Sequence, residues 1–173
     1  MRRTLVIFTT HVILWAVVAE LNHALAPRHI YLWVGALFMT FAAITLPLRA
    51  GLAASLLGGL LCDATSPVVF GTHTLLFATA HVILFNLRDR VPRDETVGRV
   101  VIALLANLAL FLVFSFLQIS HLDNAATAWP RSIFDLLCSQ LFLALIAPWY
   151  FALQTQALGL VEPLSEIYDR RLG

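Results

Sequence analysis

Three carboxylates interrupt apolar stretches of this chain: Glu20, Asp63 and Asp135. Charged groups are costly at membrane depth and usually face protein or water, so these residues are the first candidates for function. Each lies toward the outer end of its stretch, where that cost is smaller and where a carboxylate can also cap a helix or lie among lipid headgroups. Asp63 and Asp135 have similar predicted depths, and an aspartyl enzyme would require them to meet and share a proton.

Polar side chains in the fourth apolar stretch add to this group. In a helix, Thr74 and His81 share a face, and His73 lies about a quarter-turn away. Together with the carboxylates, they could line a small outward-facing cavity, although a lone histidine in a helix bundle is more often a hydrogen-bonded packing residue. The residues proposed to line this cavity are Glu20, His73, His81 and Asp135.

Motifs for catalysis or for metal binding are missing from the sequence. The chain has no H-E-x-x-H spacing, no G-x-S-x-G elbow and no Gly-rich phosphate loop. Its two cysteines, Cys62 and Cys138, are not arranged as a C-x-x-C pair. We therefore expect no enzyme activity, no cofactor, no metal and no nucleic-acid partner.

The composition indicates where these side chains must lie. Hydrophobic residues make up 60% of the 173 and charged residues only 12%, so most of the surface must face lipid. We expect an all-α bundle of about six membrane-spanning helices, forming one integral membrane domain over residues 1–173 with a short cytoplasmic tail over 156–173. From Leu160 onward this tail could be an amphipathic helix or a frayed polar segment. The six predicted spans are Thr4–Leu25, Ile30–Leu46, Leu48–Cys62, Gly71–Leu87, Val97–Ile119 and Ile133–Thr155.

Arginine placement predicts the topology. All eleven basic residues are arginines, and with six spans and the N-terminus inside, nine are cytoplasmic while only Arg28 and Arg131 are outside. Without the short third span, the arginine-rich loop from Arg88 to Arg99 would lie on the far side. The pattern therefore predicts that both termini are cytoplasmic. The nine are Arg2, Arg3, Arg49, Arg88, Arg90, Arg93, Arg99, Arg170 and Arg171.

The first span also has features of a signal peptide. Arg2 and Arg3 precede an apolar run that ends in Ala24-Leu25-Ala26, an A-x-A pattern. The run is long, polar residues come before the potential cleavage site, and Pro27 would follow it. We therefore expect the first span to remain in the protein as a helix.

Small residues mark one face of the third span. Gly51, Ser55, Gly59 and Asp63 follow one another at intervals of four, and such rows let helix backbones approach closely. The short helix should therefore be buried among its neighbours, and its small face should serve packing or partner binding. Asp63 lies at the outer end of this face, before a turn that leads to Gly71, so it could also cap that turn.

The segment from Arg49 to Phe77, RAGLAASLLGGLLCDATSPVVFGTHTLLF, resembles MreD, the small membrane component of the bacterial rod-shape system. In that family a Gly-containing helix ends in Gly-x-x-x-Asp, and a short loop leads to a glycine that opens the next span. The corresponding residues here are Gly59, Asp63 and Gly71. Chain length, span number, Pro27 and the Pro148-Trp149 pair extend the similarity less specifically.

This resemblance implies a non-enzymatic role in the bacterial cytoplasmic (inner) membrane. MreD-like proteins act with MreC, RodA, a penicillin-binding transpeptidase and the actin-like MreB to direct lateral peptidoglycan synthesis. The family is also similar in architecture to the substrate-binding S components of vitamin transporters. A transporter S component, with a ligand in an outward cavity, is therefore the alternative expectation.

Overall fold

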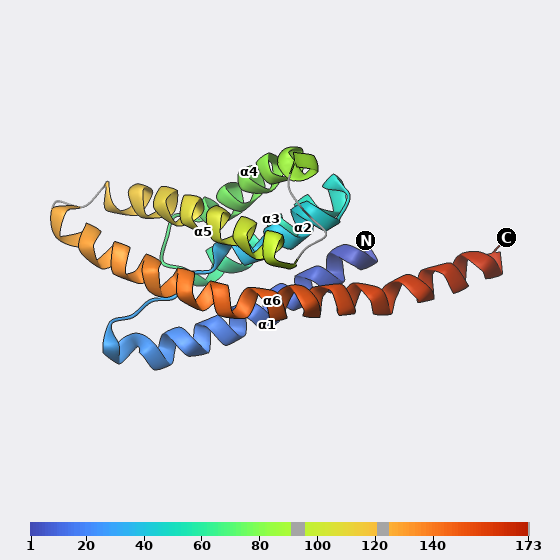
Figure 1. Ribbon diagram of the computed structural model, residues 1–173, viewed down its shortest axis with the longest axis horizontal. Helices are drawn as coiled ribbons and strands as arrows, with labels where there is room; N and C mark the ends of the chain where they lie inside the picture. Colours follow the sequence, from blue (N-terminus) through green and yellow to red (C-terminus); the bar gives the residue numbers. More distant parts are fainter. Residues whose placement is uncertain (91–95, 121–124, 173) are drawn as a thin grey trace.

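The computed structural model describes residues 1–90, 96–120 and 125–172, with side chains over 126–160 in the last range. All regular secondary structure in these ranges is helical, and Figure 1 shows the helices gathered into an elongated bundle. The elements are α1 Arg2–Leu25, η1 Ala26–Arg28, η2 Gly35–Phe38, α2 Thr40–Thr45, α3 Leu48–Thr65, α4 Thr72–Leu87, η3 Arg88–Arg90, α5 Thr96–Ile119 and α6 Ala125–Leu172.

Four helical segments in the described ranges are long and apolar enough to cross a membrane: Arg2–Arg28, Leu48–Thr65, Thr96–Ile119 and Ala126–Leu160. The expected all-helical class is confirmed over the described residues, and these four segments fit a membrane protein by length and composition. The short third span is among the four. With 18 residues it is about 27 Å long at 1.5 Å per residue, because α3 continues three residues past the predicted end at Cys62.

The second predicted span is wrong as a continuous helix. Residues 30–34 have no regular secondary structure, η2 is a single 3-10 turn, and α2 has only six residues. Nevertheless, side chains from Leu32 through Ile44 are all buried. We call residues 30–46 the interrupted segment. Its apolar composition reflects burial within the protein, which a hydropathy pattern does not distinguish from burial in lipid.

Polar contacts show that the helix ends that carry arginines lie close together. The Thr4 hydroxyl donates to the Ala50 carbonyl, and Arg88 donates to the Leu46 carbonyl, so the starts of α1 and α3 lie near the end of α4. Thr96, Arg99 and Thr155 line one hollow, which joins the start of α5 to α6. We call this the arginine-rich end. At the opposite end, Arg131 donates to the His29 carbonyl.

The last helix is longer than the span predicted for it. The sequence predicts a span that stops at Thr155, whereas α6 runs without a break from Ala125 to Leu172. In Figure 1 its last turns extend beyond the other helices, toward the side on which the N-terminus also lies. Side chains that would form the amphipathic face of the tail lie beyond residue 160, outside the described side chains.

Candidate functional site

The small-residue face of α3 packs against α4. A Cβ atom on Gly59 would lie 2.5 Å from the Thr74 Cα, so only glycine allows this approach. One turn earlier the Ser55 hydroxyl lies 2.9 Å from Nδ1 of His81, and both residues are fully buried. At Gly51 a Cβ would lie 2.7 Å from the His81 ring. This face is therefore used for packing within the chain.

The neighbouring row of α3 packs in another direction. A Cβ on Gly58 would lie 3.1 Å from Nδ1 of His11 and 3.3 Å from the Phe38 ring, which places α1 and the interrupted segment against this row. His11 is 1% exposed, and neither of its ring nitrogens has a hydrogen-bond partner. The two rows together make α3 the helix around which α1, α4 and the interrupted segment pack.

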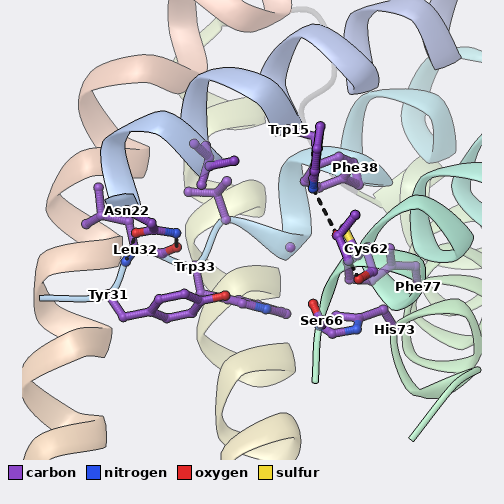
Figure 2. Close-up of a pocket in the computed structure, with 15 residues that line it drawn as sticks. Trp15, Asn22, Tyr31, Leu32, Trp33, Phe38, Cys62, Ser66, His73 and Phe77 are labelled. Carbon is purple, nitrogen blue, oxygen red and sulfur yellow. Dashed lines mark hydrogen bonds between the residues drawn. The ribbon is translucent and has the colours of Figure 1, made fainter. Parts of the chain in front are cut away.

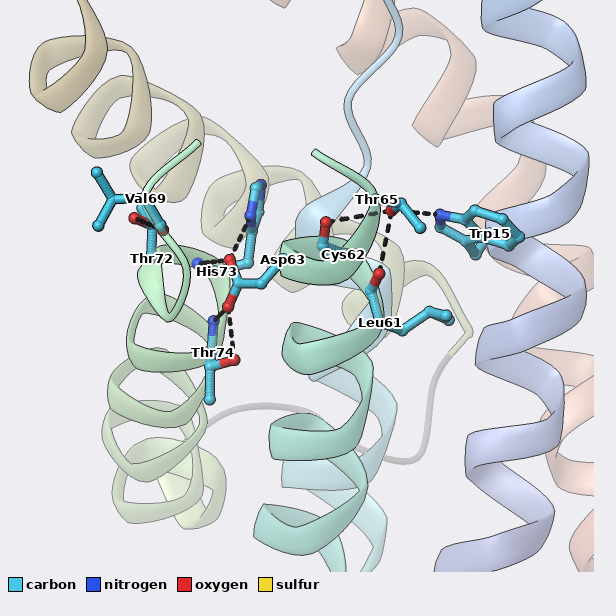
Figure 3. Close-up of polar contacts among 9 residues, drawn as sticks. All are labelled: Trp15, Leu61, Cys62, Asp63, Thr65, Val69, Thr72, His73 and Thr74. Carbon is cyan, nitrogen blue, oxygen red and sulfur yellow. Dashed lines mark hydrogen bonds and ion pairs between the residues drawn. The ribbon is translucent and has the colours of Figure 1, made fainter. Parts of the chain in front are cut away.

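Asp63 caps the start of α4 (Figure 3). Its Oδ1 accepts the backbone N–H of His73 at 2.8 Å, and its Oδ2 accepts the N–H and hydroxyl of Thr74 at 3.0 and 2.6 Å. The first N–H groups of a helix have no partner within the helix, so a carboxylate at this position stabilises α4. The chain reaches it through Gly71, whose φ of +98° favours glycine.

The same carboxylate orients the His73 ring. Nδ1 of His73 lies 2.9 Å from Asp63 Oδ1, and the ring centroid lies 4.9 Å from that of Phe114 and 6.5 Å from that of Trp33. A carboxylate that already accepts three other hydrogen bonds acts as an acceptor, so the Nδ1 atom carries the proton. Within the described part of the chain, the other ring nitrogen, Nε2, makes no hydrogen bond.

His73 borders a cavity of about 210 Å³ at the end opposite the arginine-rich end. Figure 2 shows side chains from α1, the interrupted segment, α3 and α4 converging on it. About two thirds of the fifteen residues are aromatic, aliphatic or glycine, and none is Asp, Glu, Lys or Arg. The lining is Trp15, Val18, Ala19, Asn22, Tyr31, Leu32, Trp33, Val34, Gly35, Phe38, Cys62, Thr65, Ser66, His73 and Phe77.

Of the four residues proposed to line an outward cavity, only His73 does so. Glu20 is exposed on α1, outside the lining, although its neighbour Ala19 belongs to it. His81 is buried against Ser55 nearer the arginine-rich end. Asp135 lies on α6 and does not line the cavity either.

Asp135 and Asp63 have separate partners. Asp135 Oδ1 accepts the backbone N–H of Tyr31 at 3.1 Å, and its Oδ2 lies 3.9 Å from Nε of Arg131. No hydrogen bond or ion pair joins the two carboxylates. The structure does not form the shared-proton pair that an aspartyl enzyme needs.

Three polar residues from other helices hold the interrupted segment. Asn22 bonds both the N–H and the carbonyl of Leu32, at 2.7 and 3.0 Å. Asn107 accepts from the Ala36 N–H and donates to the Trp33 carbonyl, both at 3.3 Å, and Ser139 accepts from the Trp33 N–H at 2.9 Å. Irregular backbone at membrane depth requires such partners.

A signal for these residues was present in the sequence. Asn22, Asn107 and Ser139 are uncharged polar residues inside long apolar stretches, from three different predicted spans. Such residues need hydrogen-bond partners wherever they are buried. Their partner is the backbone of the interrupted segment. The side-chain pattern along the chain does not predict that partner.

A second hollow, of about 520 Å³, lies between α4 and α5. Thirteen residues line it, and apart from Thr79 all are aliphatic or methionine. It opens beside exposed apolar side chains such as Ile83 and Leu105. This hollow offers packing surface but no group for acid–base or ligand chemistry.

Within the described residues, no three His, Cys, Asp or Glu side chains gather as a metal site would require. The chemistry that the arrangement offers is hydrogen bonding by one oriented imidazole beside aromatic rings.

No protein-family model matches this chain, and no curated protein or solved structure is significantly similar to it. The function is therefore argued from the residues and their geometry.

Proposed function

We propose that this chain is a non-enzymatic, multi-pass component of the bacterial cell-shape machinery. It supports lateral peptidoglycan synthesis in the cytoplasmic membrane through contacts with MreC, RodA, a penicillin-binding transpeptidase and MreB. The proposal starts from the resemblance of the Gly59, Asp63 and Gly71 pattern to MreD. The geometry adds a physical role for each of these three residues.

One observation carries the proposal: several polar groups inside the bundle, including a carboxylate, hold the fold. Asp63 caps α4, while Asn107 and Ser139 satisfy the backbone of the interrupted segment. Ion or proton pathways instead use ionisable groups that face one another or water. Polar residues used in this way are what a scaffold requires, since a scaffold must present its surfaces in a fixed arrangement.

For topology, we propose six membrane crossings with both termini in the cytoplasm. The interrupted segment makes the second crossing inside the bundle, where side chains of neighbouring helices replace the missing helical hydrogen bonds. The fourth crossing is α4, which at 16 residues is about 24 Å long and sheltered by α3. The arginine-rich end then faces the cytoplasm, in agreement with the positive-inside rule.

Depletion of the protein in a rod-shaped bacterial host tests this role. Cells should become round as the protein is lost, and plasmid-borne wild-type protein should restore rods. A Gly159→Ala variant should restore them equally, because nothing lies within 4 Å of a Cβ at that exposed position. Cells that remain rod-shaped after complete depletion would reject the proposal.

A second candidate, a solute-binding membrane module similar to a transporter S component, is favoured by the cavity beside His73. Affinity purification in mild detergent separates the two candidates. Co-purification of MreC, RodA or a transpeptidase supports the shape role. Co-purification of ATPase subunits supports transport and counts against the first proposal.

A further inference from the structure

We propose that the cavity bordered by His73 is a binding site for a small, uncharged aromatic or heteroaromatic molecule that carries a hydrogen-bond donor. The ring of the ligand packs among the aromatic side chains, and its N–H or O–H donates to Nε2 of His73. The site does not depend on the cell-shape role, because the cavity lies within this single chain.

The size and composition of the cavity set the class of ligand. An apolar cavity of about 150 Å³ holds a benzene ring, so 210 Å³ accommodates one ring or two fused rings. Trp15, Tyr31, Trp33 and Phe38 all belong to the lining. Aromatic rings pack favourably against such side chains in offset or edge-on arrangements.

The lack of charged side chains in the lining disfavours ionic ligands. No Asp, Glu, Lys or Arg side chain belongs to the described lining, so a charged group would lose its hydration without gaining an ion pair. Asp63, the carboxylate that orients His73, is 4% exposed and already accepts four hydrogen bonds from the first turn of α4. An uncharged molecule avoids this penalty.

The polarity of the hydrogen bond follows from the partners of His73. With Nδ1 donating to Asp63, the matching neutral tautomer of His73 has its lone pair on Nε2. His73 is only 3% exposed, and no hydrogen bond joins this atom to the residues that the structure describes. A buried acceptor without a partner favours a ligand that donates to it.

Three other polar side chains of the lining, Asn22, Trp15 and Thr65, already have partners. Both ends of the Asn22 amide bond the backbone of Leu32. The Trp15 indole N–H donates to the Thr65 hydroxyl, which in turn donates to backbone carbonyls of α3. The indole nitrogens of Trp15 and Trp33 can only donate, so His73 supplies the ring nitrogen of this lining that can accept a hydrogen bond.

Indole and benzofuran are the probes for this site. They have nearly the same shape, but only indole has an N–H donor. Cys62 belongs to the lining, whereas Cys138 on α6 does not, so the two thiols serve as an internal pair of reporters. The full chain in mild detergent is treated with methyl methanethiosulfonate, with and without each probe. Mass spectrometry then follows the modification rate of each cysteine.

Indole should slow modification of Cys62 at least threefold and leave Cys138 unchanged. Benzofuran should need roughly tenfold higher concentration for the same protection, the fold-change expected for one net hydrogen bond. Two variants extend the test. His73→Phe removes the acceptor, so indole and benzofuran should then protect Cys62 at the same concentration. Ser66→Ile keeps the Asp63 and His73 pair but fills the cavity, and should erase protection by both.

Three results would overturn the proposal. Equal slowing at both cysteines would mean that the probes act only through the detergent. Equal protection by indole and benzofuran in the wild type would show that the ligand makes no hydrogen bond to His73. A Cys62 modification rate that saturating indole leaves unchanged would show that the probe does not occupy the cavity.

Discussion

Oδ1 of Asp63 lies 2.8 Å from the backbone nitrogen of His73 and 2.9 Å from Nδ1 of the same residue's ring. One oxygen thus caps a helix and fixes the orientation of an imidazole. A change at Asp63 should therefore affect the stability of the α3–α4 pair and the cavity together.

Asp63→Asn should destabilise the protein by about 3 kcal/mol, because an amide offers one acceptor oxygen to four donors and turns its NH₂ toward some of them. Asp135→Asn should cost less than about 1 kcal/mol, since its oxygen can still accept the Tyr31 N–H. Unfolding of each variant in mixed micelles measures both values. Equal losses would contradict the capping role of Asp63.

Gly59→Ala should lower the free energy of unfolding by about 1 to 3 kcal/mol. The added methyl group would lie 2.5 Å from the Thr74 Cα and must push α3 and α4 apart. Gly159→Ala is the matched control, because its Cβ would enter open space. That control should be neutral or raise stability by up to about 1 kcal/mol through helix propensity. Melting temperatures of the two alanine variants should therefore move apart.

Asn107→Leu tests the support of the interrupted segment. It removes the partners of the Ala36 N–H and the Trp33 carbonyl, both on buried residues, and should cost about 2 to 4 kcal/mol. Asn86→Leu replaces an exposed asparagine on α4 and should stay within about 0.5 kcal/mol of the wild type. Hydrogen exchange at residues 33–36 should also accelerate in the Asn107 variant alone. Unchanged exchange there would show that the asparagine does not hold this backbone.

Gly71→Ala should cost about 1 to 2 kcal/mol, although nothing lies within 4 Å of the added Cβ. The loss comes from the φ of +98°, a conformation that residues with a side chain rarely adopt. Gly71→Asn should lose less, since asparagine tolerates left-handed backbone better than alanine. A clash would instead penalise the larger asparagine more, so the order of the two melting temperatures separates the explanations.

The helical class and the importance of α3 were open to prediction from sequence. Apolar composition predicts membrane helices, and the small residues from Gly51 to Gly59 predict close packing, which α4 provides. The possible capping role of Asp63 was also accessible, because a polar residue before a proline- and glycine-containing turn is a local signal. These features depend on neighbours along the chain or on one helical period.

Other features needed the tertiary structure. The sequence does not distinguish residues 30–46 from a spanning helix, because burial by protein and burial by lipid select the same apolar side chains. Asn22, Asn107 and Ser139 come from three distant helices, and only the fold brings them to one backbone. Likewise, Glu20 and His73 were expected at one cavity, yet the rotation of α1 leaves Glu20 outside it.

By itself, the sequence determined that the chain is helical and apolar, that its arginines gather in particular loops, and that α3 carries a small-residue face. Hydropathy and helical periodicity are properties of nearby residues, so they can be seen without coordinates. Only the tertiary structure decided that α4 covers this face, that Asp63 orients His73, and that His73 borders a cavity. Those relationships depend on which helices meet and at what rotation, and spacing along one chain does not specify either.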